Sequence, residues 1–500
     1  MSVLTADRIS SVINKYPECK HSFDAVPESA AYVVAYSGGM DSTLLLWLAR
    51  WFLAEKKNRQ LRAIHVNHGI NERADDWQNH CHDQALALGV DLVSYRRQVQ
   101  IAGKGLESAA REVRYQVFQE EMKAGEVLLQ GHHLNDLAET VLFRCVKGAA
   151  VGGLAGIPEQ RRVKLPAGRA GDVGDAGDVG DVGDVGDVGD AGAYLIYRPL
   201  LGVARSVLHE LACELKLQWI EDDSNQSLNF DRNYLRHKVL PNILQKWPGA
   251  LAGVAASAQH CRDSEQLALE VARQDLKDCH LSPVHPVVTL SGWGECPLSI
   301  ERVLSLSRVR QRNLLRYWFR AAGHTFPGNR QFARIWSEML QADKDARPVI
   351  VWRGRNGPGE IRVYQGGLYI GQQITVGNRW QDALLSVGSG QVVELPAGCL
   401  QIYRQEDGPS PGRGGGMSLA LSAGRISGQA LSVRFRRCGE KMKLTNRPAK
   451  PVKKLLQENR IPYWLRDSVP CVYCGDSLAG IFGVGVAEQF IGEDIVLSWS

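Results

Sequence analysis

Short apolar runs and longer segments of helical composition alternate along the first third of the chain. Runs rich in Val, Ile, Leu and Tyr predict buried strands at about 32–34, 61–69, 91–95 and 126–133. Helical segments follow these runs and begin near residues 41, 74, 107 and 135. This alternation, with short connections, is typical of a doubly wound parallel sheet covered on both faces. We therefore predict an α/β fold here, with ligands bound at the carboxyl ends of the strands.

The pattern changes twice in the rest of the chain. From about residue 230 to 340 it is mostly helical, and short β segments follow between about 346 and 372. A run rich in glycine and proline at 408–416 indicates a linker or loop. We expect an α/β domain over 1–228, a mostly helical middle domain over 229–375, a linker with a small β region over 376–430, and a small α+β domain over 431–500.

One helical segment of the middle domain, 308–323, combines five arginines with Leu, Tyr, Trp and Phe. Basic residues interleaved with aromatic residues suit contact with an RNA backbone and exposed bases. Aromatic residues at helical spacing are nevertheless more often part of a core. We therefore assign Trp318 and Phe319 to the core.

The stretch S-G-G-M-D-S lies where the first predicted strand meets the first helix. Glycines let backbone N–H groups approach a phosphate, and a helix N-terminus favours negative charge. The stretch lacks the lysine of a G-x-x-x-x-G-K-[ST] loop, and an aspartate beside phosphates indicates a magnesium ion. The alternative is an ordinary tight turn in which Asp41 caps the helix. The candidate nucleotide-binding residues are Ser37, Gly38, Gly39, Met40, Asp41 and Ser42.

A second polar segment, G-H-H-L-N-D-L-A-E-T at 131–140, follows the fourth predicted strand. His132, Asp136 and Glu139 fall at i, i+4 and i+7 and share one helix face. A solvated helix start with Asn135 or Asp136 as N-cap explains the same residues, and so does a zinc site. We prefer a pair of carboxylates that receives a cation, either a lysine ammonium or a magnesium ion.

Arginines form a third group of candidates. Arg111 and Arg114 share a face of the helix before this segment, and a guanidinium suits phosphate because it binds bidentately and stays charged. Pairing with neighbouring glutamates explains them equally well. Arg232 and Arg236 lie in a basic segment after residue 229, which is consistent with a solvated helix or with contact to RNA phosphate.

Composition narrows the class of protein. The 500 residues are 44% hydrophobic and 23% charged, as in globular proteins of several domains. No apolar run approaches the roughly 18 residues that span a bilayer, and no leader segment begins the chain. The 11 cysteines are odd in number and scattered, which suits reduced thiols. We expect a cytoplasmic protein with no membrane partner.

Positive charge is concentrated near the C-terminus. The segment 434–466 carries a net charge of +9, whereas the whole chain carries +5. Such concentration indicates a nucleic-acid partner, with a solvated face as the alternative. Cys471 and Cys474 form a C-x-x-C without the further ligands of a zinc site, and we interpret them as strand residues. The candidate RNA contacts here are Arg436, Arg437, Lys441, Lys443, Lys453 and Lys454.

The order of the motifs resembles a known family. SGGMDS, HVNHGI, ESAAREVRY, GHHLNDLAET, WIEDDSN and FDRNYLRHKVLP follow one another as in bacterial tRNA(Ile)-lysidine synthetases, which belong to the N-type ATP pyrophosphatases with a PP-loop. The resemblance implies ATP and Mg²⁺ as cofactors and two substrates, free L-lysine and an isoleucine tRNA with a CAU anticodon. It makes 1–228 the catalytic domain and 229–375 and 431–500 the substrate- and tRNA-binding domains. The sequence does not fix the oligomeric state, and a homodimer is one alternative.

The resemblance also implies roles for individual residues. Asp41 would hold Mg²⁺ through the ATP phosphates, and Asp136, Glu139 and His133 would bind lysine. Arg111 and Arg198 would offset phosphate charge, and Arg114, Arg232, Arg236 and the C-terminal basic residues would contact tRNA.

Three other functions remain open: a related PP-loop tRNA thiolase, an ammonia-dependent ligase acting on a small molecule, and an RNA-binding protein without activity.

A Gly-Asp repeat at 167–193 departs from the family's pattern, in which this connection is shorter. It contains almost only Gly, Ala, Val and Asp, so it buries too little apolar surface to offset chain entropy, and we expect disorder. Weak calcium binding by its aspartates is the alternative.

Deletion of residues 171–192 is expected to leave turnover nearly unchanged, because the repeat has too little apolar surface to pack on the catalytic domain. Steady-state rates of the full-length and deleted proteins test this. A large loss of turnover would assign the repeat a role in the reaction.

Overall fold

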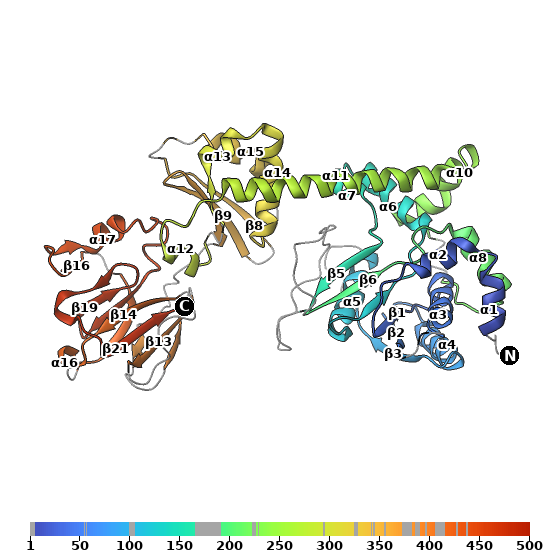
Figure 1. Ribbon diagram of the computed structural model, residues 1–500, viewed down its shortest axis with the longest axis horizontal. Coiled ribbons are helices and arrows are strands. Elements are labelled where there is room, and N and C mark those ends of the chain that lie inside the picture. The colour runs from blue at the N-terminus through green and yellow to red at the C-terminus, as the bar shows by residue number, and fades with distance from the viewer. Residues whose placement is uncertain are drawn as a thin grey trace. The chain divides into compact units, whose positions relative to one another are not determined.

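The computed structural model divides into two compact units, residues 1–267 and 268–500, which are described separately (Figure 1). Some positions lie outside the described residues, among them the Gly-Asp repeat up to residue 191 and the predicted linker up to residue 415. The full set left out is 1–5, 55, 57, 100–105, 166–191, 223–226, 229, 294–295, 325–328, 342, 344–345, 355–356, 373–382, 386–390, 396–397, 406–415, 427–428 and 437–438.

The first unit is built on a six-stranded sheet with the order β3-β2-β1-β4-β6-β5. All neighbouring strands run parallel except β5, which pairs antiparallel with β6 at the edge. The predicted parallel sheet is confirmed, whereas the antiparallel edge strand was not predicted. The strands are β1 (Ala31–Ala35), β2 (Gln60–Asn67), β3 (Asp91–Arg96), β4 (Val127–Leu129), β5 (Gln160–Lys164) and β6 (Ala193–Tyr197).

Helices cover both faces of this sheet because the side chains of β1 alternate between two cores. Tyr32 and Val34 pack in one core with residues of α1, α2, α3, α4 and α8, whereas Val33 packs in another with residues of α5. The helices are α1 (Ala6–Ile13), α2 (Pro17–Asp24), α3 (Met40–Phe52), α4 (Ala74–Ala87), α5 (Leu106–Glu121), α6 (Leu134–Val146), α7 (Val151–Leu154) and α8 (Arg205–Glu214).

The strand order places β1 between β2 and β4, so the chain leaves β1 toward one side and β4 toward the other. Such a switch point opens a crevice at the carboxyl ends of the two strands. β4 is only three residues long, shorter than the predicted 126–133, because the chain leaves the strand to begin α6. The loops after β1 and β4 therefore meet at this crevice.

A helical run follows the sheet: α9 (Asp231–Tyr234), the π-helix η2 (Leu235–Val239), α10 (Leu240–Lys246) and α11 (Ala250–Cys279). Pro241 explains the wide π turn, since it has no N–H to donate and its ring crowds the carbonyl four residues earlier. Leu240 N instead donates to Leu235 O, five residues back. The wide turn sets the direction of the side chains on η2.

The second unit begins with an antiparallel sheet of order β7-β10-β9-β8 and the helices beside it. Trp318 and Phe319 are fully buried in its core, as predicted. Its elements are α12 (Pro286–Leu290), β7 (Leu298–Ser299), α13 (Ile300–Ser305), α14 (Arg308–Ala321), α15 (Asn329–Arg334), the π-helix η3 (Ile335–Met339), β8 (Val349–Gly354), β9 (Gly357–Tyr364) and β10 (Gly367–Gln372).

The C-terminal part contains two larger antiparallel sheets and a two-stranded one. Strands on both sides of residue 430 share these sheets: β11 (Ala383–Leu385) pairs with β15 (Leu431–Phe435), and β14 (Met417–Leu421) pairs with β21 (Ile495–Trp499). The boundary predicted at 430 therefore passes through both sheets. The remaining elements are β12 (Val392–Glu394), β13 (Cys399–Arg404), α16 (Ala423–Ile426), β16 (Lys441–Met442), β17 (Lys450–Pro451), α17 (Val452–Glu458), β18 (Pro470–Cys474), β19 (Ser477–Ile481), β20 (Gly485–Val486) and η4 (Glu488–Phe490).

Two sequence predictions can be checked on these elements. Cys471 and Cys474 lie buried in β18, which confirms them as strand residues. Within the described part of the chain, no helix is both long and apolar enough to cross a membrane.

Leu45 of α3 is fully buried beneath the sheet, whereas Leu86 of α4 is 71% exposed. Leu45→Ala is expected to lower the free energy of unfolding by about 2–5 kcal/mol because it leaves a cavity. Leu86→Ala, the matched control, should change it by less than about 0.5 kcal/mol. Urea denaturation of both variants tests this, and equal effects would contradict the assigned core.

Candidate active site

The loop between β1 and α3 is held in shape by the hydroxyl of Ser42. Ser42 Oγ accepts a hydrogen bond from Ser37 N at 3.2 Å and donates one to Gly39 O at 3.0 Å. Ser42 is 7% exposed, whereas Ser37 is exposed. The hydroxyl of Ser42 therefore shapes the loop, and it also holds the exposed Ser37 hydroxyl, whose Oγ lies 3.0 Å from Ser42 Oγ.

Gly38 is required by both conformation and space. Its φ of +87° lies in the left-handed region, and a Cβ there would come within 2.5 Å of Ile220 Cδ1 and 2.7 Å of Cys81 Sγ. Gly39 caps α3 in an extended conformation, so the N–H groups of the first helical turn point into the crevice. Met40, also a predicted nucleotide contact, packs its side chain in the core and offers only its backbone.

Asp41 has the donor atoms that a metal ion needs. Its Oδ1 is buried without a hydrogen-bond partner among the described residues, and its Oδ2 lies 3.7 Å from His133 Nε2. Burial raises the pKa of Asp41, and the electrostatic interactions with His133, Arg205 and Arg236 offset this only in part. A single orphaned carboxylate oxygen at a helix N-terminus fits Mg²⁺ bound together with phosphate oxygens.

His133, not His132, completes this polar face. His133 caps α6: its Nδ1 accepts from Asp136 N at 3.2 Å, and Asp136 Oδ2 accepts from His133 N at 3.0 Å. Because Nδ1 accepts a hydrogen bond, the ring proton lies on Nε2 and faces Asp41. The prediction that His132 shares the face of Asp136 and Glu139 is wrong, because α6 begins only at Leu134.

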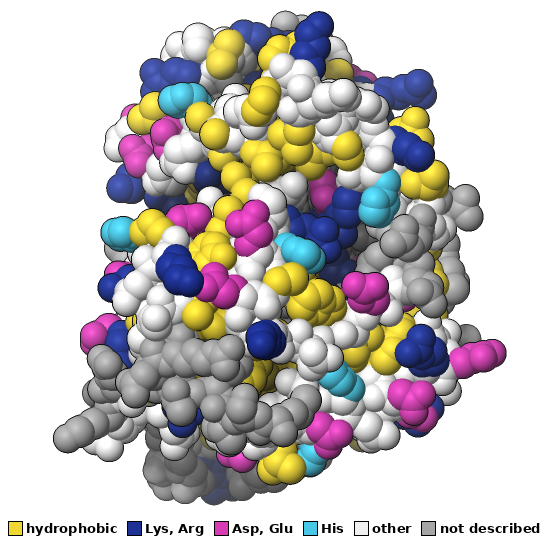
Figure 2. Space-filling model, turned by 90° about the vertical axis from the view of Figure 1, so that its right-hand side faces the viewer, with side chains coloured by type: hydrophobic (Ala, Val, Ile, Leu, Met, Phe, Trp, Pro, Cys, Tyr) yellow, Lys and Arg dark blue, Asp and Glu magenta, His cyan; other side chains and the backbone are white. Residues whose placement is uncertain are grey.

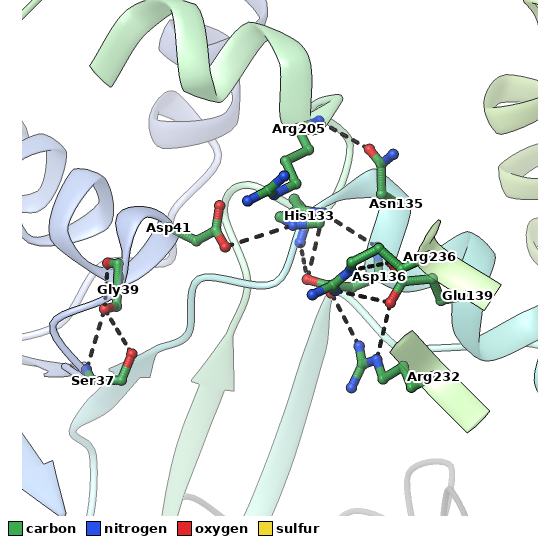
Figure 3. Close-up of polar contacts among 11 residues, drawn as sticks. Ser37, Gly39, Asp41, His133, Asn135, Asp136, Glu139, Arg205, Arg232 and Arg236 are labelled. Atoms are coloured by element: carbon green, nitrogen blue, oxygen red, sulfur yellow. Dashed lines mark hydrogen bonds and ion pairs between the residues drawn. The ribbon is translucent and has the colours of Figure 1, made fainter. Parts of the chain in front are cut away.

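Asp136 and Glu139 meet the guanidinium groups of Arg232 and Arg236 (Figure 3). From Arg232, Nη2 lies 3.1 Å from Asp136 Oδ1 and Nε lies 3.1 Å from Glu139 Oε2. From Arg236, Nε lies 2.7 Å from Glu139 Oε1 and Nη2 lies 3.0 Å from Asp136 Oδ1. The carboxylate pair does hold cations, and in this structure they are two arginines of the same chain.

This charge cluster changes the chemistry of Asp136. Burial raises the pKa of Asp136, but the electrostatic interactions with His133, Arg232 and Arg236 outweigh it and lower the pKa to about 2. Asp136 is therefore ionised at neutral pH.

Lys and Arg side chains gather in a hollow near the centre of the face of the molecule seen in Figure 2.

The remaining predicted arginines lie near the carboxyl ends of the strands in different surroundings. Arg198 is 3% exposed, and its Nη1 donates to Pro158 O at 2.7 Å. Arg111 is exposed and lies over the ring of Tyr115, 5.2 Å from its centroid. Burial lowers the pKa of His68 to about 4, and the charge of Arg114 adds to this effect. Burial lowers the pKa of His132, and the charges of Arg198 and Arg111 add to this effect, so these arginines lie near the segment after β4.

Sequence reasoning missed Arg205 and Asn135. Arg205 N donates to Asn135 Oδ1 at 3.0 Å, and the charge of Arg205 acts on Asp41 (Figure 3). No local motif separates them from other polar residues at helix starts. Beside them opens a cavity of about 420 Å³, lined by Asn135, Glu139, Arg205, Ser206, His209, Glu210, Arg236, His237, Leu240, Pro241 and Leu244.

The predicted C-terminal RNA contacts are mostly on the surface. Lys441, Lys453 and Lys454 are exposed. Lys443 is also exposed but lies 2.6 Å from Glu488, and Arg436 pairs with Asp467. Arg437 lies outside the described residues.

Comparisons with known proteins agree with this arrangement of domains. Residues 8–243 match the PP-loop domain, 298–369 the TilS substrate binding domain and 431–499 the TilS substrate C-terminal domain. A tRNA(Ile)-lysidine synthase of Coxiella burnetii is 32% identical over 94% of this chain and 92% of its own length. That of Pseudomonas aeruginosa is 34% identical over 95% and 94%.

The chain belongs to the tRNA(Ile)-lysidine synthase family. It is therefore an ATP-binding enzyme of the PP-loop class, a ligase that modifies tRNA. A solved structure of a U34-tRNA thiolase from Methanococcus maripaludis covers 50% of this chain and 80% of its own, at 17% identity. The TM-score of this match is 0.38, so the structural likeness supports no conclusion about the reaction.

In this member of the tRNA(Ile)-lysidine synthase family, the pH dependence of the unfolding free energy tests whether the charge cluster lowers the pKa of Asp136. The pKa of Asp136, at about 2, lies below the usual 3.8, so its stabilisation is present above about pH 4 and is lost as the pH falls toward 2. Between about pH 5 and pH 2.5, wild type should lose roughly 2 kcal/mol more unfolding free energy than Asp136→Asn. Urea denaturation across this range measures it. Parallel losses in both proteins would show that the cluster does not lower this pKa.

Proposed function

We propose that this protein joins free L-lysine to carbon 2 of the wobble cytidine in an isoleucine tRNA with a CAU anticodon. Oxygen 2 of the cytosine attacks the α-phosphorus of ATP and pyrophosphate leaves, which gives an adenylated base. The ε-amine of lysine then attacks carbon 2, loses a proton, and AMP leaves. The modified base reads AUA instead of AUG, and the tRNA carries isoleucine rather than methionine identity. Such a reaction takes place in the cytoplasm.

The observation that carries this proposal is the meeting of the loop and the charge cluster at one crevice. His133 connects them, because it caps the helix of Asp136 and faces Asp41 at 3.7 Å. The loop 37–42 offers N–H groups to the ATP phosphates, and Asp41 would hold Mg²⁺, which neutralises phosphate charge when bound. Arg111 and Arg198 would offset the charge that develops as pyrophosphate leaves.

Asp136 and Glu139 are the proposed site of the lysine amine. Glu139 is 1% exposed and Asp136 is 8% exposed, so both charges need a cation. Arg232 and Arg236 supply it in the free protein, and the substrate ammonium would replace part of these contacts. A guanidinium released in this way stays charged and can contact RNA phosphate. The amine must be neutral to attack, and its reference pKa is about 10.4, so a general base is needed. With a pKa of about 2, Asp136 is a weak base and would position the amine, which leaves Glu139 as the carboxylate that would accept the proton.

The cysteine nearest to the loop argues against the thiolase alternative. Cys81 packs against Gly38, and burial raises the pKa of its thiol to about 12. A thiol that stays protonated is a poor sulfur nucleophile.

Within the described part of the chain, no group of three His, Cys, Asp or Glu side chains is placed to hold a metal ion.

The direct test uses purified protein, ATP, radiolabelled lysine and a transcript of the CAU-anticodon tRNA. Lysine should enter the RNA only when both ATP and this tRNA are present. Release of pyrophosphate without incorporation of lysine would assign another nucleophile to the reaction. Tight binding of tRNA without turnover of ATP would contradict an enzymatic role.

Asp41→Asn should lower pyrophosphate release by roughly 100-fold, because the amide is a poor ligand for a magnesium ion. Asp83→Asn is the matched control, since Asp83 is exposed on α4 and is not among the residues assigned to the site. Release is measured at saturating ATP and tRNA over a series of magnesium concentrations. An Asp41→Asn protein with the wild-type rate would remove this residue from the proposed site.

A further inference from the structure

Helix α14 carries a row of arginines along one face. Arg308, Arg312 and Arg316 recur every four residues and are exposed, so they follow one another up the helix at intervals of about 6 Å. Leu314, Leu315, Trp318 and Phe319 of the same helix are buried in the core. The row therefore lies on a helix that is fixed by its packing.

The three arginines line a cavity of about 310 Å³ together with Phe332, Ala333 and Trp336. The aromatic wall is rigid, because Trp336 Nε1 donates to Gln311 Oε1 at 3.0 Å and the ring meets Phe332 edge-on at 4.6 Å. The guanidinium of Arg308 lies over the Trp336 ring at 4.4 Å. This contact holds the first arginine of the row in place.

The cavity is strongly positive. Three of its six lining residues are arginines, and none of the six carries a carboxylate. Like charges four residues apart on a helix each cost about 0.2–0.5 kcal/mol. Arg310, on the same helix but outside the row, pairs with the buried Asp275. The row thus has a charge arrangement that an anionic ligand would stabilise.

We propose that this cavity binds consecutive phosphate groups of an RNA backbone. Guanidinium groups bind phosphate bidentately, and their spacing along α14 is comparable with that of successive phosphates on a strand. A stacked base is a poorer fit, since Phe332 and Trp336 are only 5% and 7% exposed. The proposal rests on the proposed function for the identity of the RNA, which is the tRNA substrate. It assigns a phosphate-binding site to α14, apart from the crevice of the first unit.

The double variant Arg312→Gln/Arg316→Gln tests the proposal in the full-length protein. Its affinity for the tRNA transcript is measured by fluorescence anisotropy from about 50 to 300 mM salt. Two lost phosphate contacts should weaken binding about tenfold and make the slope of log K against log salt shallower by about 2. Arg312→Lys/Arg316→Lys, which keeps the charges, should restore most of the slope and less of the affinity.

Arg320→Gln is the matched control, because Arg320 is exposed one turn further along α14 and does not line the cavity. It should bind tRNA as wild type does, and circular dichroism should give equal melting temperatures for all variants. An unchanged salt slope in the double variant, or an equal loss in Arg320→Gln, would overturn the proposal. So would loss of inorganic phosphate binding with unchanged tRNA binding, since the cavity would then take a small anion. Lysine transfer by wild type in the same preparation tests the proposed function separately.

Discussion

Two buried carboxylates on α6 need positive charge, and much of the first unit is arranged to provide it. Asp136 and Glu139 are held by Arg232 and Arg236 from the helical run after the sheet. An isolated buried charge costs several kcal/mol, so this run is fixed against the sheet domain by electrostatics as well as by packing. We propose the same carboxylates as the site of a substrate ammonium. Stability of the free protein and recognition of the amine would then depend on one cluster.

The cluster acts in the reaction only because the sheet places it beside the loop after β1. β1 and β4 are neighbours at the point where the strand order reverses, so the segments after them share one crevice. The backbone of Gly131 packs against Asp41, where a Cβ would come within 3.2 Å of the Asp41 backbone. His133 then connects the two polar groups. The proposed positions for a phosphate, a metal ion and an amine would thus be set by backbone geometry before any ligand binds.

Local features could be predicted from the sequence, and features that depend on distant contacts could not. Neighbouring residues suffice to predict the strand β1, the glycine turn after it and the start of α3. They also suffice to predict the burial of Trp318. The choice between His132 and His133 depends on where α6 begins, which a shift of one residue decides. The pairing of Arg232 with Asp136 joins residues 96 positions apart, and no local pattern encodes it. The edge strand β5 owes its place to pairing with β6, across the Gly-Asp repeat.

We propose that the carboxylate pair exchanges its arginines for the amine of lysine, which a crystal structure with free lysine and a non-hydrolysable ATP analogue would show. Lysine Nζ should lie within hydrogen-bond distance of both Asp136 and Glu139, with at least one guanidinium contact of Arg232 or Arg236 released. Lysine bound elsewhere, with all five hydrogen bonds between the arginines and the carboxylates intact, would rule out this exchange.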